Sequence, residues 1–402
     1  MWGVISTVFL VVYFFMSSYI GLRGWIALDR PASRLYKTVY WGFFSLLVIS
    51  FPLAKIGENF LPDTIALWLT ILGGYSLVGV SYIFLLLLLI DLFRILDKRI
   101  NFVPAAIKQH KNTPVIIGAV VIITVVSTLV YGGWNARNPV VTEYALTVYK
   151  KADPLKQLKI AMVSDIHYGS IMDIRRLNSL SKIMNELRPD IILLAGDITD
   201  GVIQQEEARK LTNLLGQMPS KYGIFAVTGN HDRGLRGDDG ELLNCLKEAG
   251  INVLRDSQLK IGDSFYLIGR DYPRRQSPQG RKEIEDLLKE VDSSQPLIIL
   301  DHQPADLQKA QENNVDLQLS GHTHVGQIFP INLITGYLYE LDWGLLKKGS
   351  YHLIVSSGYG TWGPPLRVGN NPEVVSIIIK FKSQSTDGSV TSPEDHNTVE
   401  KH

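Results

Sequence analysis

The 402-residue chain contains a single cysteine, Cys245. One thiol excludes an intrachain disulfide and a cysteine-based zinc site, so neither can hold this fold together. Cys245 lies in a stretch with helical spacing of leucines, where we expect it to fill space in the core. An excess of charge is also lacking, because the formal net charge is +1 at pH 7. This balance gives no reason to expect nucleic acid as a partner.

Charge is scarce above all in the first third of the chain. Ten of the 40 basic residues and five of the 39 acidic residues lie before Asn135. The part after Asn135 is therefore mildly acidic, which again argues against a nucleic-acid-binding surface. The charge-poor part contains four long apolar stretches: Trp2–Ile20, Val39–Ala54, Thr64–Ile90 and Pro114–Tyr131. A helix needs roughly 20 residues to cross the hydrocarbon core, and all but the second, shorter stretch reach this length. We predict a transmembrane region of about four helices over residues 1–134.

The loops between these stretches predict the orientation in the cell membrane. The loop between the first and second stretches and the loop between the third and fourth are basic. The loop between the second and third stretches holds only Lys55 beside Glu58 and Asp63. Because basic short loops stay in the cytoplasm, everything after Tyr131 is expected to be extracytoplasmic. One alternative is open: Gly73-Gly74 could split the third stretch into two half-helices, and the odd count would place the remainder in the cytoplasm.

Residues 135–157 read as a linker followed by an edge strand, and residues 158–382 as an α/β domain. In that domain short apolar runs alternate with segments of helical periodicity, and the last third turns to strands. This order predicts layered sheets covered by helices. Residues 383–402 are polar and lack aromatic residues, so we expect a disordered tail.

Five stretches with polar, chemistry-bearing side chains follow predicted strands. Ile191–Ala195 reads as a strand buried on both faces, and Gly196-Asp197 follows it directly. The other stretches are Ser164–His167, Gly229–Asp232, Asp301–Pro304 and Gly321–His324. Ligand sites of α/β sheets form at the carboxyl ends of strands, so we expect these stretches to converge. Residues two apart in extended backbone share a side, which lets Asp165 and His167 bind one ion together and lets His322 and His324 approach one site.

The side chains in these stretches favour two divalent cations. Carboxylates and imidazoles, with an amide oxygen from Asn230 and no thiolate, suit Mn²⁺, Fe or Zn²⁺. Two cations close together need a shared carboxylate, and Asp197 is the best-placed candidate. Such a pair lowers the pKa of a bridging water and produces a hydroxide at neutral pH. We expect His231 to protonate the leaving group and Asp232 to orient His231. Asp200 and Asp301 either contact these groups or only cap turns.

Taken in order, these motifs resemble the full signature of the calcineurin-like metallophosphoesterases, and the similarity extends from Leu158 to Phe381. The motifs are Asp165-Ile166-His167, Gly196-Asp197-Ile198-Thr199-Asp200, Gly229-Asn230-His231-Asp232, His302-Gln303-Pro304 and Gly321-His322-Thr323-His324. The resemblance implies a four-layer α/β/β/α sandwich with a dinuclear metal centre. It assigns Asp165, His167, Asp197 and His324 to the first ion. It assigns Asp197, Asn230, His302 and His322 to the second, with His231 as the catalytic histidine.

Two segments are similar to the branch of membrane-associated bacterial phosphodiesterases typified by YkuE and YaeI. They are Gly321–Gln327 and the Gly- and Pro-rich segment Gly358–Arg367. The chain departs from the branch at Val325, where members usually have a second glycine, although no ligand is affected. Arg367 is expected to bind the substrate phosphate with its planar guanidinium. The tract 331–348 is either a flap toward the bilayer or a locally packed segment.

The sequence therefore predicts a membrane-anchored, metal-dependent phosphodiesterase that acts on a lipid-linked or envelope phosphoester. The alternative within enzymes is a pyrophosphatase that cleaves a nucleotide-linked lipid precursor of the UDP-diacylglucosamine type, with a cytoplasmic site. A binding protein that had lost its chemistry would be expected to lack a ligand, and each ligand type is present. A transporter is disfavoured because the apolar stretches carry almost no ionisable residue at mid-membrane depth.

Overall fold

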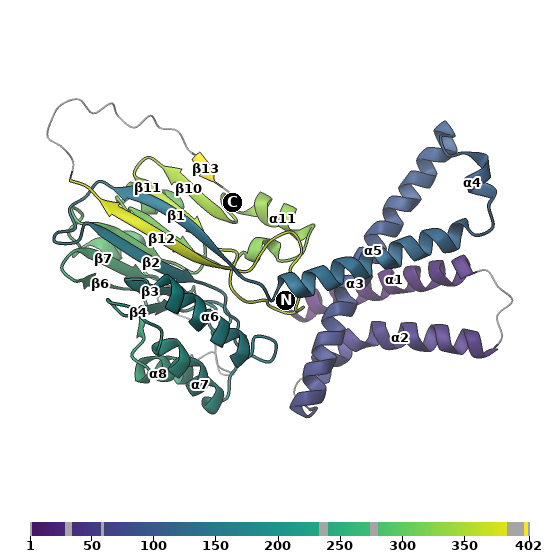
Figure 1. The fold of residues 1–402 in the computed structure, drawn as a ribbon, viewed down its shortest axis with the longest axis horizontal. Coiled ribbons are helices and arrows are strands. Elements are labelled where there is room, and N and C mark those ends of the chain that lie inside the picture. The colour runs from purple at the N-terminus through teal and green to yellow at the C-terminus, as the bar shows by residue number, and fades with distance from the viewer. Residues whose placement is uncertain are drawn as a thin grey trace. The chain divides into compact units, whose positions relative to one another are not determined.

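The computed structural model describes residues 2–28, 34–57, 60–232, 240–273, 280–383 and 398–400. The chain divides into two compact units (Figure 1). The first comprises Met1–Trp134 together with Gly363–Leu366, and the second comprises Asn135–Trp362 together with Arg367–His402.

The first unit is helical. Its long helices are α1 (Trp2–Leu28), α2 (Arg34–Gly57), α3 (Asp63–Ile100) and α5 (Thr113–Asn135), and the short α4 spans Ala105–Gln109. Each of the four long helices is apolar enough and long enough to cross a membrane, so the protein is a membrane protein with four candidate spans.

Helix α3 runs without interruption through Gly73 and Gly74. A Cβ atom at Gly73 would lie 2.8 Å from the Cα atom of Phe51, so the glycine allows α2 and α3 to approach closely. The alternative of two half-helices is therefore wrong, and the described residues contain four long apolar helices rather than five.

The second unit contains two β-sheets. The first has the strand order β1 (Val140–Val148), β12 (Glu373–Phe381), β2 (Gln157–Val163), β3 (Ile191–Ala195), β4 (Ile224–Val227) and β5 (Asn252–Val253). The second has the order β13 (Thr398–Glu400), β10 (Gly344–Lys348), β11 (Tyr351–Val355), β9 (Leu317–Ser320), β8 (Leu297–Leu300), β7 (Phe265–Gly269) and β6 (Ser257–Ile261). Strands β2 to β5 pair in parallel in the first sheet, as do β7, β8, β9 and β11 in the second. Parallel pairing brings the carboxyl ends of neighbouring strands to one edge of each sheet.

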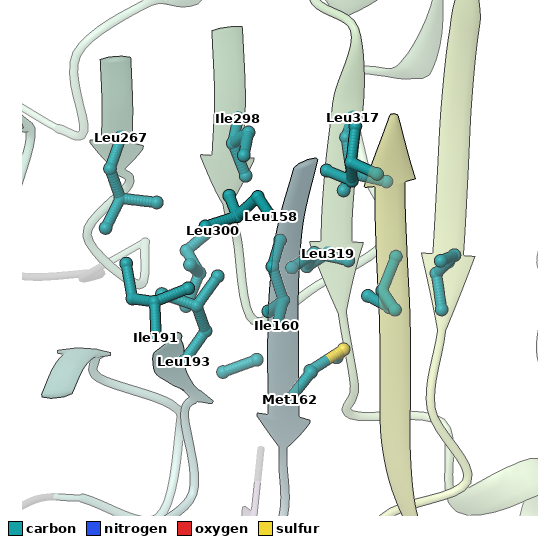
Figure 2. Packing of buried hydrophobic residues seen from close by; sticks show 14 of the residues in the cluster. Leu158, Ile160, Met162, Ile191, Leu193, Leu267, Ile298, Leu300, Leu317 and Leu319 are labelled. Atoms are coloured by element: carbon teal, nitrogen blue, oxygen red, sulfur yellow. The ribbon is translucent and has the colours of Figure 1, made fainter. Parts of the chain in front are cut away.

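The main hydrophobic core lies between the two sheets. On β2, Leu158, Ile160 and Met162 point toward the second sheet, as the two-residue period of a strand requires (Figure 2). They pack with Ile191 and Leu193 of β3 and with leucine and isoleucine side chains of β7, β8 and β9. The residues between them, such as Ala161, belong to a separate core on the other face of the sheet.

Helices cover the outer face of each sheet. The first sheet packs against α6 (Ile174–Leu187), α7 (Gln205–Gly216) and α8 (Gly240–Glu248). The second packs against α9 (Ile284–Leu288) and α10 (Leu307–Glu312). All five residues of β3 are buried because this strand has neighbours on both faces. The predicted four-layer α/β/β/α sandwich is confirmed.

The C-terminal residues differ in part from the prediction of a disordered tail over 383–402. Thr398–Glu400 form β13, which pairs with β10 in antiparallel orientation. The prediction is wrong for these residues, because β10 offers an edge whose backbone groups a polar strand can satisfy as well as an apolar one. Residues 384–397 and 401–402 lie outside the described residues.

Candidate metal centre

The five polar stretches come together at the carboxyl ends of strands from both sheets. Strands β2, β3 and β4 end at the stretches that carry Asp165, Asp197 and Asn230. Strands β8 and β9 end at those that carry His302 and His322. These residues lie within hydrogen-bonding distance of one another across the two sheets, so the centre spans the sandwich rather than belonging to one sheet.

One group of ligand atoms surrounds the end of β2. The Nε2 atoms of His167 and His324 lie 3.0 Å apart, and His324 Nε2 lies 3.2 Å from Asp165 Oδ1. Asp197 Oδ2 lies 3.8 Å from His167 Nε2 and closes this group. The four side chains are the set that the family resemblance assigned to the first ion, and all four are buried.

A second group shares Asp197. Its Oδ2 atom lies 3.2 Å from His302 Nε2, which in turn lies 3.3 Å from Asn230 Oδ1 and 3.3 Å from His322 Nδ1. Asp197 therefore touches both groups, as a bridging carboxylate must.

The donor set fits divalent cations. The Nδ1–H group of His302 donates to the carbonyl oxygen of Ala195 at 2.8 Å, so in the neutral ring Nε2 carries the lone pair, directed at the other ligand atoms. Lone pairs of imidazole, carboxylate and amide oxygen thus converge, and such a set of acceptors is satisfied by a cation. Burial raises the pKa of Asp197, but the nearby His302 and His167 outweigh it and lower that pKa to about 2. Burial lowers the pKa of both His322 and His324 to about 4, which favours the neutral, metal-binding form.

The backbone of the centre is strained where the predicted ligands lie. Five of them have φ between 48° and 72°, in the left-handed region that side-chain-bearing residues rarely adopt: Asp165, His167, Asp197, His322 and His324. Val325, where members of the similar bacterial branch usually carry glycine, also has a positive φ of 51°. Such conformations cost roughly 1–3 kcal/mol each and cluster at functional sites. The strain is therefore independent support for a functional centre here.

Two motif glycines are required because ligand side chains occupy the space of a Cβ atom. A Cβ at Gly229 would lie 2.1 Å from Asp197 Oδ1, and one at Gly321 would lie 2.2 Å from Asp165 Oδ2. Neither separation is compatible with a side chain, so the two glycines let the carboxylates reach into the centre.

His231 is held beside the shared carboxylate. Its backbone N–H donates to Asp197 Oδ1 at 2.7 Å, and its ring lies 4.7 Å from that of His167. Its Nδ1 atom lies 3.0 Å from Asp200 Oδ1. The prediction that Asp232 orients His231 is therefore wrong. Asp232 is buried and accepts hydrogen bonds from the backbone N–H groups of Thr199 and Gly229, so it fixes the loop instead.

Burial and charge act in opposite directions on His231. Burial lowers its pKa, but the hydrogen bond to Asp200 and the charge of Asp197 outweigh this and raise the pKa above the ordinary value. The protonated ring is therefore stabilised relative to that of an ordinary histidine. Asp232 behaves differently, because burial and the neighbouring charge of Asp197 raise its pKa to about 6.

Arg367 does not present its guanidinium to a substrate. The side chain is completely buried, and its Nη2 donates to the carbonyl oxygens of Ser357, Gly358 and Gly360. Nη1 donates to Asn370 Oδ1 at 2.8 Å, and Nη2 lies 3.3 Å from Nδ1 of His324. The predicted substrate-binding role is wrong in this geometry, because protein acceptors use the donors. Arg367 instead supports the loop behind His324.

Several residues around the centre were not predicted. Gln303 Nε2 lies 3.2 Å from His322 Nε2 and 3.2 Å from the hydroxyl of Tyr272, while the rings of Tyr272 and Tyr339 flank that of His322. Of these three residues, only Gln303 lies in a motif that the sequence analysis identified, His302-Gln303-Pro304. Behind His302, Asp301 forms ion pairs with the buried Arg270 and with Arg281, so it is more than a turn cap.

Comparison with known proteins identifies the chain. The sequence model of the calcineurin-like phosphoesterase family matches residues 158–326. A transmembrane protein with metallophosphoesterase domain from Danio rerio is 30% identical over 341 residues, which cover 80% of this chain and 76% of that protein. An uncharacterized metallophosphoesterase of Helicobacter pylori strain J99 is 33% identical over 57% of this chain and 62% of its own length. The uncharacterized metallophosphoesterase YkuE of Bacillus subtilis is 29% identical over 55% of this chain and 79% of its own.

The chain belongs to the calcineurin-like metallophosphoesterases. It is accordingly a hydrolase that acts on phosphoester bonds and depends on a dinuclear metal centre, and its candidate spans agree with the transmembrane relatives.

Proposed function

We propose that the protein is a phosphodiesterase of the membrane surface, with its metal centre on the extracytoplasmic side and Mn²⁺, Fe or Zn²⁺ as the bound ions. The observation that carries the proposal is the position of Asp197, which lies between two sets of ligand atoms and also accepts the backbone N–H of His231. One carboxylate thus contacts both sets of metal ligands and also positions His231, the residue expected to transfer a proton.

The residues that would hold the ions are those of the two groups. Asp165, His167, Asp197 and His324 would bind one ion, and Asp197, Asn230, His302 and His322 the other. Bound there, two divalent cations would lower the pKa of a water molecule and offset the charge that develops on the phosphate oxygens. The protein's contribution is to fix the geometry, and the strained backbone and the buried shared carboxylate serve that purpose.

His231 is placed to act as a general acid. Its Nδ1 faces Asp200, so the protonated ring carries its second proton on Nε2. The raised pKa favours retention of that proton, and the ring is only partly buried, so a substrate can reach it. We infer that Nε2 protonates the oxygen of the departing alcohol, while Asp200 fixes the ring and stabilises its charge.

Two features favour a diester on the outer side of the membrane. A phosphate monoester carries a second negative charge. Arg367, the arginine expected to bind phosphate, donates to protein carbonyl oxygens instead and does not offset that charge, which favours a diester. The orientation follows from the basic first and third loops together with an even number of candidate spans in the described residues.

The test uses the full chain in lipid nanodiscs supplied with Mn²⁺. We expect hydrolysis of bis-p-nitrophenyl phosphate to exceed that of p-nitrophenyl phosphate, and His231→Asn to lower the rate by about 10²–10⁴-fold. The loss should be larger for alkyl than for p-nitrophenyl leaving groups, since a good leaving group needs less protonation. His110→Asn, an exposed histidine of the basic loop, is the matched control. Preference for the monoester, or equal losses for both leaving groups, would contradict the proposal.

A second measurement tests the side of the membrane. A cysteine replacing the exposed Leu259 on β6 should react with a membrane-impermeant maleimide on intact cells, whereas the buried natural Cys245 should not. Reaction only after permeabilisation would place the metal centre in the cytoplasm.

A further inference from the structure

Helix α11 (Ile331–Leu338) is amphipathic, but its apolar face points outward and its polar face points toward the protein, the reverse of a surface helix in water. Its polar residues face the protein: Thr335 donates to Asp342 Oδ2 at 2.9 Å, and the side-chain oxygen of Asn332 is buried. Its apolar residues face outward, with Tyr337 89%, Leu338 68%, Leu333 64% and Ile334 58% exposed. A surface helix in water places its apolar stripe toward the core, so this helix is built for an apolar environment.

The exposed face extends beyond the helix and lacks charge. No charged residue occurs from Ile328 to Tyr339. Phe329 precedes the helix and is half exposed, and so is Trp362, whose backbone is bonded twice to the side chain of Gln327. We refer to these exposed apolar side chains as the apolar surface: Phe329, Leu333, Ile334, Tyr337, Leu338 and Trp362. Aromatic residues beside aliphatic ones are typical of protein surfaces at the membrane interface.

This apolar surface is connected to the point where the chain leaves the last candidate span. Asn135, the final residue of α5, donates through its side chain to the carbonyl oxygens of Arg367 and Asn370, at 3.1 and 2.7 Å. The loop that contains those residues also bonds the apolar segment, because Phe329 N–H donates to Val368 O at 2.8 Å. Asn135, the first residue of the second unit, is thus bonded to the same loop that supports Phe329.

The same segment is joined to the metal centre at both ends. His324 lies in the short helix η1 (His324–Gly326), a few residues before α11. After α11, Tyr339 places its ring 6.4 Å from that of His322, and Thr323 donates to the carbonyl oxygen of Asp342 at 2.6 Å. The apolar surface therefore adjoins the side of the centre where His322 lies.

We propose that α11, with Phe329 and Trp362, inserts into the interfacial layer of the lipid bilayer and holds the metal centre against phosphodiesters that are themselves part of the membrane. The choice of lipid over a protein partner rests on two observations: the loop that supports Phe329 is bonded to Asn135, the residue at which the chain leaves its last candidate span, and residues 328–339 carry no charge. The statement about substrates rests on the proposed phosphodiesterase function, whereas the statement about insertion does not.

Insertion is tested with an environment-sensitive fluorophore on the full chain in nanodiscs. In a Cys245→Ala background, Tyr337→Cys carries the label, and Leu259→Cys on β6 is the control for an exposed apolar position elsewhere. We expect spin-labelled lipids to quench the probe at position 337 but not at 259, and aqueous iodide to do the reverse. Quenching of position 337 by iodide would show that water covers the helix. Shielding from both quenchers would show that protein covers it. Either result overturns the proposal.

The substrate statement is tested with two chromogenic diesters: soluble bis-p-nitrophenyl phosphate, and hexadecyl p-nitrophenyl phosphate embedded in the nanodisc. Leu333→Gln combined with Leu338→Gln should leave the soluble reaction unchanged and lower the embedded one by about tenfold or more. Leu259→Gln is the control and should affect neither. Equal effects on both substrates, or no effect, would overturn the proposal. If the wild-type chain hydrolyses neither diester, the phosphodiesterase assignment fails, and the quenching experiment still decides insertion.

Discussion

Nδ1 of His231 and Oδ1 of Asp200 lie 3.0 Å apart, and this contact defines which aspartate serves the proposed general acid. The carboxylate that follows His231 directly in sequence, Asp232, is turned away from the ring and bonded to backbone N–H groups. The two aspartates therefore have separable roles.

The first prediction concerns Asp200. Asp200→Asn should lower kcat by about 10- to 100-fold while the fold is retained, because the imidazole loses the partner that orients it. Asp200 raises the pKa of His231, so its removal should lower that pKa. A general acid must be protonated, and the alkaline limb of the pH–rate profile should therefore move to lower pH. The measurement is the pH dependence of kcat for bis-p-nitrophenyl phosphate.

Asp232→Asn is the matched comparison for that experiment. It should lower the thermal stability, because one of the backbone N–H groups of Thr199 and Gly229 loses its acceptor, and it should leave the alkaline limb in place. If Asp232→Asn moves the limb and Asp200→Asn does not, the assignment of the partner is reversed.

The second prediction concerns Arg367. Arg367→Ala should destabilise the domain by about 3–5 kcal/mol, because buried carbonyl oxygens lose their donors. Arg367→Lys keeps the charge but not the fork of donors, so it should restore only part of the stability. In the lysine variant KM for a soluble diester should be unchanged at temperatures where the protein is folded. A large rise in KM with unchanged stability would instead mean that Arg367 binds the phosphate.

The third prediction concerns pH and metal binding. Burial by itself lowers the pKa of His302, but the carboxylate of Asp197 outweighs it and raises the pKa to about 10 in the metal-free protein. The raised pKa stabilises the metal-free fold fully below the ordinary value of 6.5, and that stabilisation is lost as pH rises through about 10. A cation must displace this proton, so its apparent affinity should rise with pH by up to about tenfold per unit below pH 10.

Calorimetric titration of the chelated protein with Mn²⁺ checks this expectation. At pH 7.5, buffers of different ionisation enthalpy should reveal the release of about one proton from His302 on binding. His302→Gln should abolish that release. Binding of metal without proton uptake by the buffer would show that His302 is already neutral in the metal-free protein.

Much of this centre can be predicted from the sequence because the metal ligands follow closely after strands that are themselves recognisable from short stretches of sequence. A ligand such as Asp197 lies two residues after the end of β3, and parallel pairing of strands brings such ends together regardless of the loops. The same reasoning predicts the sandwich, because β3 is apolar at every position and β2 alternates between two cores.

The roles that the sequence did not predict depend on loops. Whether Asp200 or Asp232 faces His231 depends on how the turn after Thr199 folds, and no periodicity determines that. Arg367 lies in a segment rich in glycine and proline, where a guanidinium can turn inward as readily as outward. The sequence does not determine whether the apolar side chains of α11 face outward. A short apolar segment with Asn332 and Thr335 is compatible with either a packed or an exposed helix.

The central claim is that one aspartate serves two metal ions. The direct measurement is the metal content of the full chain after loading with Mn²⁺ and removal of the excess, determined by elemental analysis alongside folding controls. The wild-type protein should hold two ions per chain, and Asp197→Asn should lose both, whereas Asp165→Asn should keep one. Retention of one full equivalent by folded Asp197→Asn would contradict the account.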